Sequence, residues 1–524
     1  MKFKIWSATL ALVVVVSSCG EFLDINDNPN SPTTADVQLV LPQAIVASAS
    51  IANQFNSYGG HFGGFIANAG GFSGFGTLLN YNLAPGDYNN MWVNTYTGPL
   101  QDFKYVIDQT AGDPNMAFYN AAAKIMSVVN FQRLVDAYGD VPFTQALRGE
   151  EGVNAPSYDD AATIYQSLIA TLDEAIAQID NNPLALGLTA SADPLFGKLL
   201  LVSGAEQMLA WKRYANTLKL RMLVRTNNTA GLASIATTFG GQSAFLVDDV
   251  IVNPGYELNR PNPAWATWGR TIAGALANSS RIPTTFSFAF YSGTKILDQG
   301  RGATIYVNYP ATPNNQLGNE DGAPTIVTGQ VTWASNASGL AGTGVLKGPA
   351  MGQPLMLLAE SKFLLAEAQL RGNIAGDYVA TFYEGISASF RYLYKNESGN
   401  VIGSANLTTL LNNYKTANAA NKLVEIEAAT NLPERLEAII TQKYIAMNMI
   451  TSDEAWNEYR RTGFPITIPG GAPARDIASN KSSITTRTDR LPTRVMYPSS
   501  EQSLNASNYR NVDYTSERIF WDPN

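Results

Sequence analysis

The chain has 524 residues, of which 45% are hydrophobic and only 15% are charged, so it can bury a large core. Acidic residues outnumber basic residues by 43 to 35, and the chain therefore lacks the basic surface that non-specific nucleic-acid binding requires. Its single cysteine excludes an internal disulfide and a cysteine-based metal site, and its single histidine, His61, argues against multi-histidine zinc sites and most histidine-dependent hydrolases.

The first residues are typical of a secretory signal. Lys2 and Lys4 precede an apolar run that ends in Ser17-Ser18-Cys19-Gly20. The run is too short to span a bilayer. Its last four residues are similar to a bacterial lipobox, in which the cysteine is acylated and becomes the new N-terminus. We therefore expect a signal peptide over residues 1–18, a lipid on Cys19 and a tether over residues 19–35. An ordinary signal with a nearby free cysteine is the alternative.

The tether contains a partial match to a calcium loop. Residues 24–30, DINDNPN, alternate oxygen-bearing side chains, but Pro29 stands where the loop needs glycine and Ala35 where it needs glutamate. We expect no cofactor and no metal, and bound calcium is possible but unsupported.

Helical periodicity dominates the rest of the chain. Gly139 and Pro142 predict a sharp helix end, and Asp159 or Asp160 is expected to cap the clearest amphipathic helix. The predicted helices span 36–55, 91–110, 116–138, 158–179, 197–225, 355–371, 377–393 and 433–450.

This pattern predicts a mainly α fold of helical hairpins, as in a helical-repeat solenoid. We expect a single domain over residues 36–524, with a helical scaffold over 36–230 and 351–450. A loop-rich insert with minor β structure, residues 231–350, would form the ligand face, and a loop-rich tail would follow over 451–524. Short strands are expected at 245–252, 304–309 and 324–333, and one short helix near 285–297.

Two aromatic-rich segments are the candidate ligand-binding residues. The low charge and the many aromatic residues suit neutral ligands such as sugars, whose C–H faces stack on aromatic rings. Alternatively, these rings cover neighbouring helices or anchor loops to the core. The glycine-rich segment 58–90 and the insert supply the candidates Phe75, Tyr81, Tyr88, Trp265, Trp268 and Trp333, and we expect the proline-flanked pair Trp265 and Trp268 to be partly exposed.

Paired carboxylates are the only candidates for catalysis. Glu360 and Glu367 share one face of a predicted helix, and Asp453 lies beside Glu454 and Trp456. Catalytic carboxylates normally face each other from different elements, so a structural role is favoured and no catalytic residue is assigned.

Several short motifs, taken in order, resemble one family. They are FLDINDNPN after Cys19, Tyr138–Pro142, Ala215–Arg221, Ala359–Ala368, Tyr383–Ile386, Trp456–Pro465 and Pro492–Pro498, the last followed by Glu501, Asn505 and Asn508, with a looser match at Asp298–Arg301. Over nearly its full length the chain resembles the SusD/RagB-like nutrient-binding lipoproteins of Bacteroidetes.

This resemblance implies a tetratricopeptide-like body, lipid-anchored at the outer membrane and facing the cell exterior. Such a protein is a non-enzymatic lid over a SusC-like TonB-dependent β-barrel transporter, to which it delivers an oligosaccharide or a peptide. It contacts the membrane through its lipid only. A lipid-anchored glycoside hydrolase or lyase, using Glu360 or Asp453, and a protein-binding scaffold are the alternatives.

Overall fold

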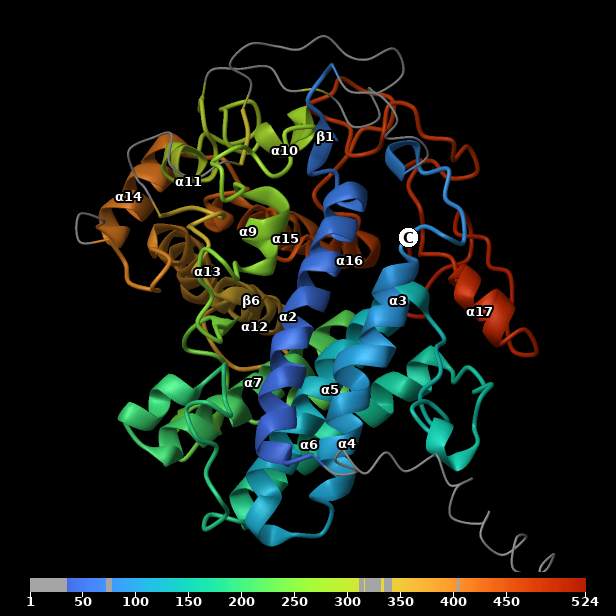
Figure 1. Ribbon diagram of the computed structural model, residues 1–524. Coiled ribbons are helices and arrows are strands. Elements are labelled where there is room, and N and C mark those ends of the chain that lie inside the picture. Colours follow the sequence, from blue (N-terminus) through green and yellow to red (C-terminus); the bar gives the residue numbers. More distant parts are fainter. Residues whose placement is uncertain (1–34, 72–77, 311–314, 316–330, 334–341, 403–405) are drawn as a thin grey trace, which may run out of the picture.

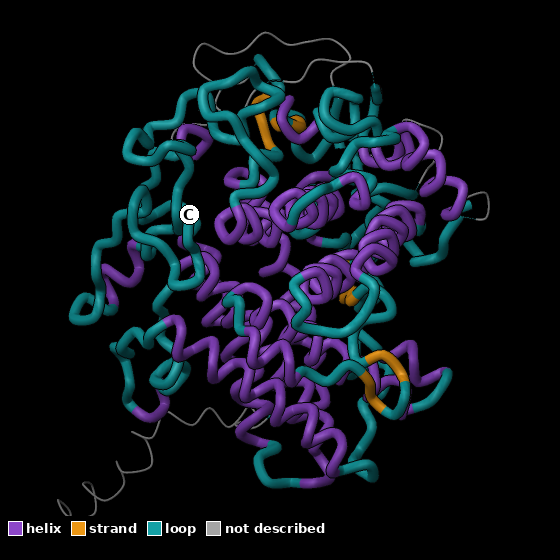
Figure 2. Tube along the Cα trace, turned by 180° about the vertical axis from the view of Figure 1, so that it is seen from behind, coloured by secondary structure: helices purple, strands orange, loops and turns teal. Residues whose placement is uncertain are grey.

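The computed structural model describes residues 35–71, 78–310, 315, 331–333, 342–402 and 406–524. Helices form about half of this part of the chain, and loops gather at one end and along one side (Figures 1 and 2). The strands that it contains form three separate two-stranded sheets. The mainly α fold with a minor β component is therefore confirmed.

Helix α2 (Val37–Phe62) runs through the middle of the molecule (Figure 1). Asp36 caps it by accepting a hydrogen bond from the Gln38 N–H at 2.9 Å. The prediction of a helix over 36–55 was too short, because glycine in the last turns indicated a loop. Gly59 instead stays helical and lets α16 (Ser452–Thr462) approach, since a Cβ on Gly59 would lie 2.0 Å from the Asp453 nitrogen.

The next helices pack around α2 and against each other in chain order. The helix predicted over 91–110 is interrupted, because Gly98 has non-helical φ and ψ and Pro99 follows it. Asp160 caps α6 as expected, accepting from the Thr163 N–H at 2.8 Å. These elements are α3 (Asn89–Thr95), η2 (Tyr96–Leu100), α4 (Gln101–Gln109), α5 (Ala117–Tyr138), α6 (Ala161–Asn181) and α7 (Gly204–Arg225).

Helix α5 is the most enclosed helix of this group. The sequence predicted one broad apolar stripe, but α5 is buried on nearly every side, because α2, α4, α6 and α7 all contact it. Helix α6 has the single stripe that was predicted, with Ile164, Leu168, Leu172, Ala175 and Ile179 all buried.

The insert contains short elements joined by long loops. Residues 304–309, expected as a strand, hold the end of a helix, and the residues before 331 in the expected strand 324–333 lie outside the described part. The elements are α8 (Thr229–Ser234), β2 (Thr238–Phe239), β3 (Gln242–Ser243), β4 (Val250–Val252), α9 (Pro263–Trp268), β5 (Arg281–Pro283), α10 (Thr285–Phe288) and α11 (Gln299–Ile305).

The chain then returns to the helical body. Strand β6 pairs with β4, and α12 and α13 pack together as a hairpin. The segment expected as a loop-rich tail begins with helix α16. The remaining elements are β6 (Gln353–Met356), α12 (Leu358–Leu370), α13 (Tyr378–Tyr394), α14 (Leu407–Ala417), α15 (Leu432–Ala446) and α17 (Ser499–Leu504), with short helical turns η1 (Leu78–Asn80), η3 (Pro114–Met116), η4 (Gly149–Glu151), η5 (Gly197–Leu201) and η6 (Ile426–Ala428).

The close approach of α2 and α16 gives a testable prediction. We expect Gly59→Ala to lower the free energy of unfolding by about 3 kcal/mol, because the added methyl group forces two backbones apart. Chemical denaturation measures this change. Gly204→Ala is the matched control, since the first residue of α7 has open space around its Cβ position and alanine favours the helix. Equal stability of the two variants would contradict the prediction.

Candidate functional site

The two segments expected to form the ligand face lie side by side. Strand β1 (Ile66–Asn68) pairs antiparallel with β5, placing Ile66 opposite Pro283. The Thr284 hydroxyl donates to the Gly64 carbonyl at 2.5 Å, and the Asn315 amide donates to the Asn68 carbonyl at 2.6 Å. We call this contact between the segment after α2 and the insert the β1–β5 junction.

Tyr88 lies near the junction in a partly buried aromatic cluster. Its ring packs edge-on against Tyr58 and Phe62, with centroids 5.5 and 5.7 Å away. Its hydroxyl lies 3.2 Å from Nδ1 of His61. Burial, with a contribution from the Arg281 cation, lowers the pKa of His61 to about 3, so the imidazole is neutral near pH 7. Nε2 of His61 is buried without a hydrogen-bond partner in the described part of the chain.

Two of the candidate tryptophans are brought together from distant positions. The rings of Trp268 and Trp333 meet edge to face, with centroids 6.1 Å apart. Trp268 ends α9 and is partly exposed, whereas Trp333 is 4% exposed. The Trp333 indole N–H donates to Asn448 at 3.4 Å.

Three of the candidate aromatic rings are buried in the structure. The expected exposure of Trp265 was wrong, because this residue lies in helix α9 and not in a loop, and is 5% exposed. Trp333 and Tyr81, at 4% and 0%, also have no exposed ring face. These three rings belong to the core, so Tyr88 and Trp268 remain as candidates with accessible surface. Phe75, Cys19 and the partial calcium loop lie outside the described residues.

A pocket of about 530 Å³ opens between η5, β4 and the turn after α13. The Lys395 ammonium in it contacts Asp248 and Asp249 at 2.7 and 2.8 Å. Lys347 donates to the carbonyls of Gly344 and Tyr392 at 2.7 and 2.8 Å, and burial lowers its pKa to about 7. No motif or pattern in the sequence predicted this pocket. Its charges are largely satisfied by each other, so its geometry suits a neutral, hydrogen-bonding molecule.

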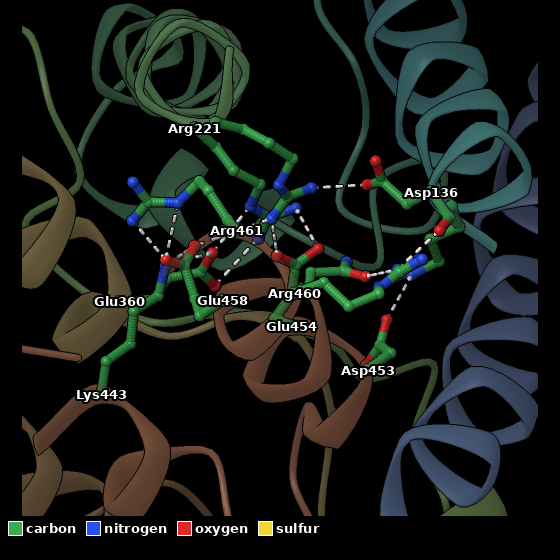
Figure 3. Close-up of polar contacts among 12 residues, drawn as sticks. Asp136, Arg221, Glu360, Lys443, Asp453, Glu454, Glu458, Arg460 and Arg461 are labelled. Carbon is green, nitrogen blue, oxygen red and sulfur yellow. Dashed lines mark hydrogen bonds and ion pairs between the residues drawn. The ribbon is translucent and has the colours of Figure 1, made fainter. Parts of the chain in front are cut away.

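The carboxylates considered for catalysis lie in a buried charge network (Figure 3). Glu360 is fully buried and binds Arg221 with two hydrogen bonds of 2.7 and 2.9 Å. Lys443 lies 3.8 Å from the same carboxylate. In an Arg–carboxylate pair of this geometry, the two hydrogen bonds fix the position of both side chains, and burial shields the pair from solvent. Glu360 is therefore a structural residue.

Glu367 and Asp453 are also part of this network. Glu367 accepts two hydrogen bonds from Arg461, at 2.8 and 2.6 Å. Asp453 lies 3.7 Å from Arg133, and both side chains are almost fully buried. Glu454 pairs with Arg225, and Glu458 pairs with Lys443 at 2.9 Å. The sequence placed Glu360 and Glu367 on a predicted helix and the other carboxylates in the expected loop-rich tail, and it contained no indication of their partners.

The pKa values reflect this pairing. Burial would raise the pKa of Glu454, but the cations of Arg221 and Arg225 outweigh it and lower the pKa to about 2. Burial raises the pKa of Asp453 to about 6, because the more distant Arg133 offsets it only in part. A raised carboxyl pKa is one requirement of a general acid, but this side chain faces Arg133 and not solvent.

The short motifs of the sequence meet in and around the network. Arg460 donates to the carbonyls of Thr493 and Asp136 at 3.0 and 2.7 Å, joining α16, the C-terminal segment and α5. Arg494 donates to the Tyr138 carbonyl, and its guanidinium lies next to Gly139. Residues of these motifs thus stabilise the fold. The motifs are those at 138–142, 215–221, 359–368, 456–465 and 492–498.

Comparison with known proteins agrees with this architecture. A family model described as SusD-like, "Starch-binding associating with outer membrane", matches residues 29–498. The chain belongs to the SusD-like family. None of the curated proteins matches the chain.

Solved structures of similar proteins have the same fold over almost the whole chain. A SusD homologue from Bacteroides uniformis is 21% identical, with a TM-score of 0.64 over 94% of this chain and 100% of its own. A SusD-like protein from Bacteroides thetaiotaomicron is 18% identical, with a TM-score of 0.67 over 93% and 99%. A chitin-binding protein is 22% identical, with a TM-score of 0.65 over 93% and 100%.

Membership of the SusD-like family supports a carbohydrate-binding role and an association with the outer membrane. No helix in the described ranges is long and apolar enough to cross a membrane.

The charge network gives a second prediction. We expect Glu360→Gln to lower the free energy of unfolding by about 3–5 kcal/mol, because it keeps the shape of the side chain but leaves Arg221 buried without its main counter-charge. Urea denaturation measures the change. The control is Glu384→Gln, which removes an exposed partner of Lys362 and should change stability by about 0.5 kcal/mol or less. A Glu360→Gln variant as stable as this control would show that the pair contributes little.

Proposed function

We propose that this protein is a non-enzymatic lipoprotein of the outer membrane, facing the cell exterior, that binds an oligosaccharide and caps a SusC-like TonB-dependent transporter. The observation that carries the proposal is the SusD-like match over residues 29–498, in a family described as starch-binding and associated with the outer membrane. The similar chitin-binding protein adds chitin oligosaccharides to starch oligosaccharides as the first ligands to test.

The β1–β5 junction is the part of the surface that we assign to ligand binding. It joins the two segments richest in aromatic residues, and these segments contain the half-buried residues Tyr88 and Trp268. Stacking of a sugar on such a ring buries the apolar face of the sugar, and neighbouring amides and hydroxyls can bind its hydroxyl groups. Neither step needs a charged group or a metal.

The buried network supports a binding function over the hydrolase alternative. Glycoside hydrolysis needs two carboxyl groups that reach the same bond from opposite sides. Glu360 and Asp453 instead face arginines inside the protein. Binding of a peptide in place of an oligosaccharide, or of a protein partner alone, would each be recognised in the experiments below.

Alanine substitutions at two neighbouring tryptophans test ligand binding and stability separately. We expect Trp268→Ala to weaken oligosaccharide binding about five- to tenfold with little change in melting temperature, because the ring is partly exposed. Calorimetric titration with chitin and starch oligosaccharides measures the affinity. Trp265→Ala is the matched control: its ring is buried, and its loss should cost about 3–5 kcal/mol of stability. Unchanged affinity in Trp268→Ala would remove this residue from the site.

The transporter partner is tested by purification from the native outer membrane in a mild detergent. We expect a β-barrel transporter to co-purify in equal amount, and mass spectrometry of the complex to show any bound oligosaccharide or peptide. Cys19→Ser is the control, because loss of the thiol prevents acylation and should release the protein from the membrane. A protein that remains alone after crosslinking would contradict the lid function.

A further inference from the structure

A second pocket, of about 230 Å³, lies between the loop after α10, helix α15 and the loop after α16. Its lining includes Phe290, Lys295, Glu437, Thr441, Ile466 and Arg475, and we call it the Lys295 pocket. No short motif of the sequence contains these residues.

Lys295 has an unusual environment for a cation. Its ammonium lies over the rings of Phe286 and Phe290, 3.7 and 4.4 Å from their centroids. Nζ is buried and has no hydrogen-bond partner in the described part of the chain. Burial lowers the pKa of Lys295 to about 7, with Glu437 opposing this shift and Arg475 adding to it. The pocket therefore contains a cation whose charge is poorly compensated.

Other polar groups of the pocket are also available. Thr441 is fully buried, and its hydroxyl oxygen has no partner among the described residues. Within the same part of the chain, the side chains of Arg475 and Glu437 make neither a hydrogen bond nor an ion pair. Buried polar groups are normally paired, so the unpaired Lys295 Nζ and Thr441 Oγ1 indicate a missing partner. Arg475 is exposed and Glu437 is half-buried, and both line the same pocket. Lys295, Arg475 and Glu437 together give the pocket one net positive charge.

Apolar surface completes the pocket. Ile466 and Ile468 are 51% and 48% exposed at its edge, and Phe290 forms part of its wall. Exposed isoleucines beside donors are suited to a ligand with both an anionic group and an apolar body.

We propose that the Lys295 pocket binds a small molecule with a carboxylate, an apolar body and an N–H or O–H donor. The carboxylate contacts the Lys295 ammonium, the Arg475 guanidinium and the Thr441 hydroxyl, and the donor contacts the Glu437 carboxylate. A neutral sugar leaves the charge of Lys295 uncompensated and is expected to bind more weakly than an anion. The carboxylate can belong to a peptide or amino acid, or to an acidic sugar, and the proposal does not depend on the β1–β5 junction.

Calorimetric titration of the purified mature protein tests the ligand class with four probes. N-acetyl-leucine has the carboxylate, the amide N–H and the apolar body, and we expect it to bind. N-acetyl-leucinamide lacks only the anionic charge and should bind at least about tenfold more weakly. Glucuronate and glucose form the second pair. Tighter binding of glucuronate than of N-acetyl-leucine would assign the pocket to acidic sugars, and binding of neither anion at millimolar concentration would overturn the proposal.

Two lysine variants test the residue. Lys295→Met keeps a long apolar chain without the charge, and it should weaken binding of the preferred anion about tenfold or more. Lys212→Met is the matched control: Lys212 also lies over an aromatic ring, that of Phe239 at 4.2 Å, but it is paired with Asp180. Melting curves confirm that both variants are folded. Equal affinity of the Lys295→Met variant and the unmodified protein would overturn the proposal.

The pH dependence is a separate readout. The ammonium of Lys295 binds an anion and the neutral amine does not, while the carboxylate of the probe stays ionised above about pH 5. Glu437 and Arg475 are the other charged groups that line the pocket. Affinity should therefore fall as the pH rises from about 6 to about 9 around the pKa of about 7, and this fall should be absent in Lys295→Met. A flat profile in the unmodified protein would contradict a role for the lysine charge.

Discussion

The pairing of buried charges is the constraint on which the rest of this structure depends. Arg221 and Arg225 on α7 bind Glu360 on α12, Asp136 on α5 and Glu454 on α16. A buried charge without a partner costs several kcal/mol, so these helices can take only positions that bring the partners together. The network thereby joins the helices before the insert to those after it, and a few motif residues fix the whole helical body.

Because the charges of this network are buried and paired, they are not available to a ligand. The network and the pockets differ in one physical respect. Glu360 is bound directly by the Arg221 guanidinium, whereas the Lys295 ammonium lies over aromatic rings and has no hydrogen-bond partner in the described part of the chain. A buried charge that is already paired stabilises the fold and gains little from a further partner. A buried charge without a partner is stabilised when a ligand supplies that partner.

Local sequence patterns predicted the elements that are stabilised locally. Helix α6 follows its apolar stripe and is capped by Asp160, and Gly139 ends α5 as expected. Prediction failed where distant segments decide the outcome. Gly59 is part of helix α2, and α16 packs so closely against it that no side chain would fit. Helix α5 is buried on nearly every side because four helices surround it. Among the candidate aromatic residues, Trp265 was expected to be partly exposed but is buried.

The sequence by itself determined the mainly helical fold and the resemblance to SusD-like proteins, because periodicity and short motifs are local properties. Only the tertiary structure decided which side chains are available for a ligand. Trp265 and Trp268 are three positions apart on one short helix, yet the first is buried and the second partly exposed. Exposure depends on what the rest of the chain places against a side chain, and no local pattern contains that information.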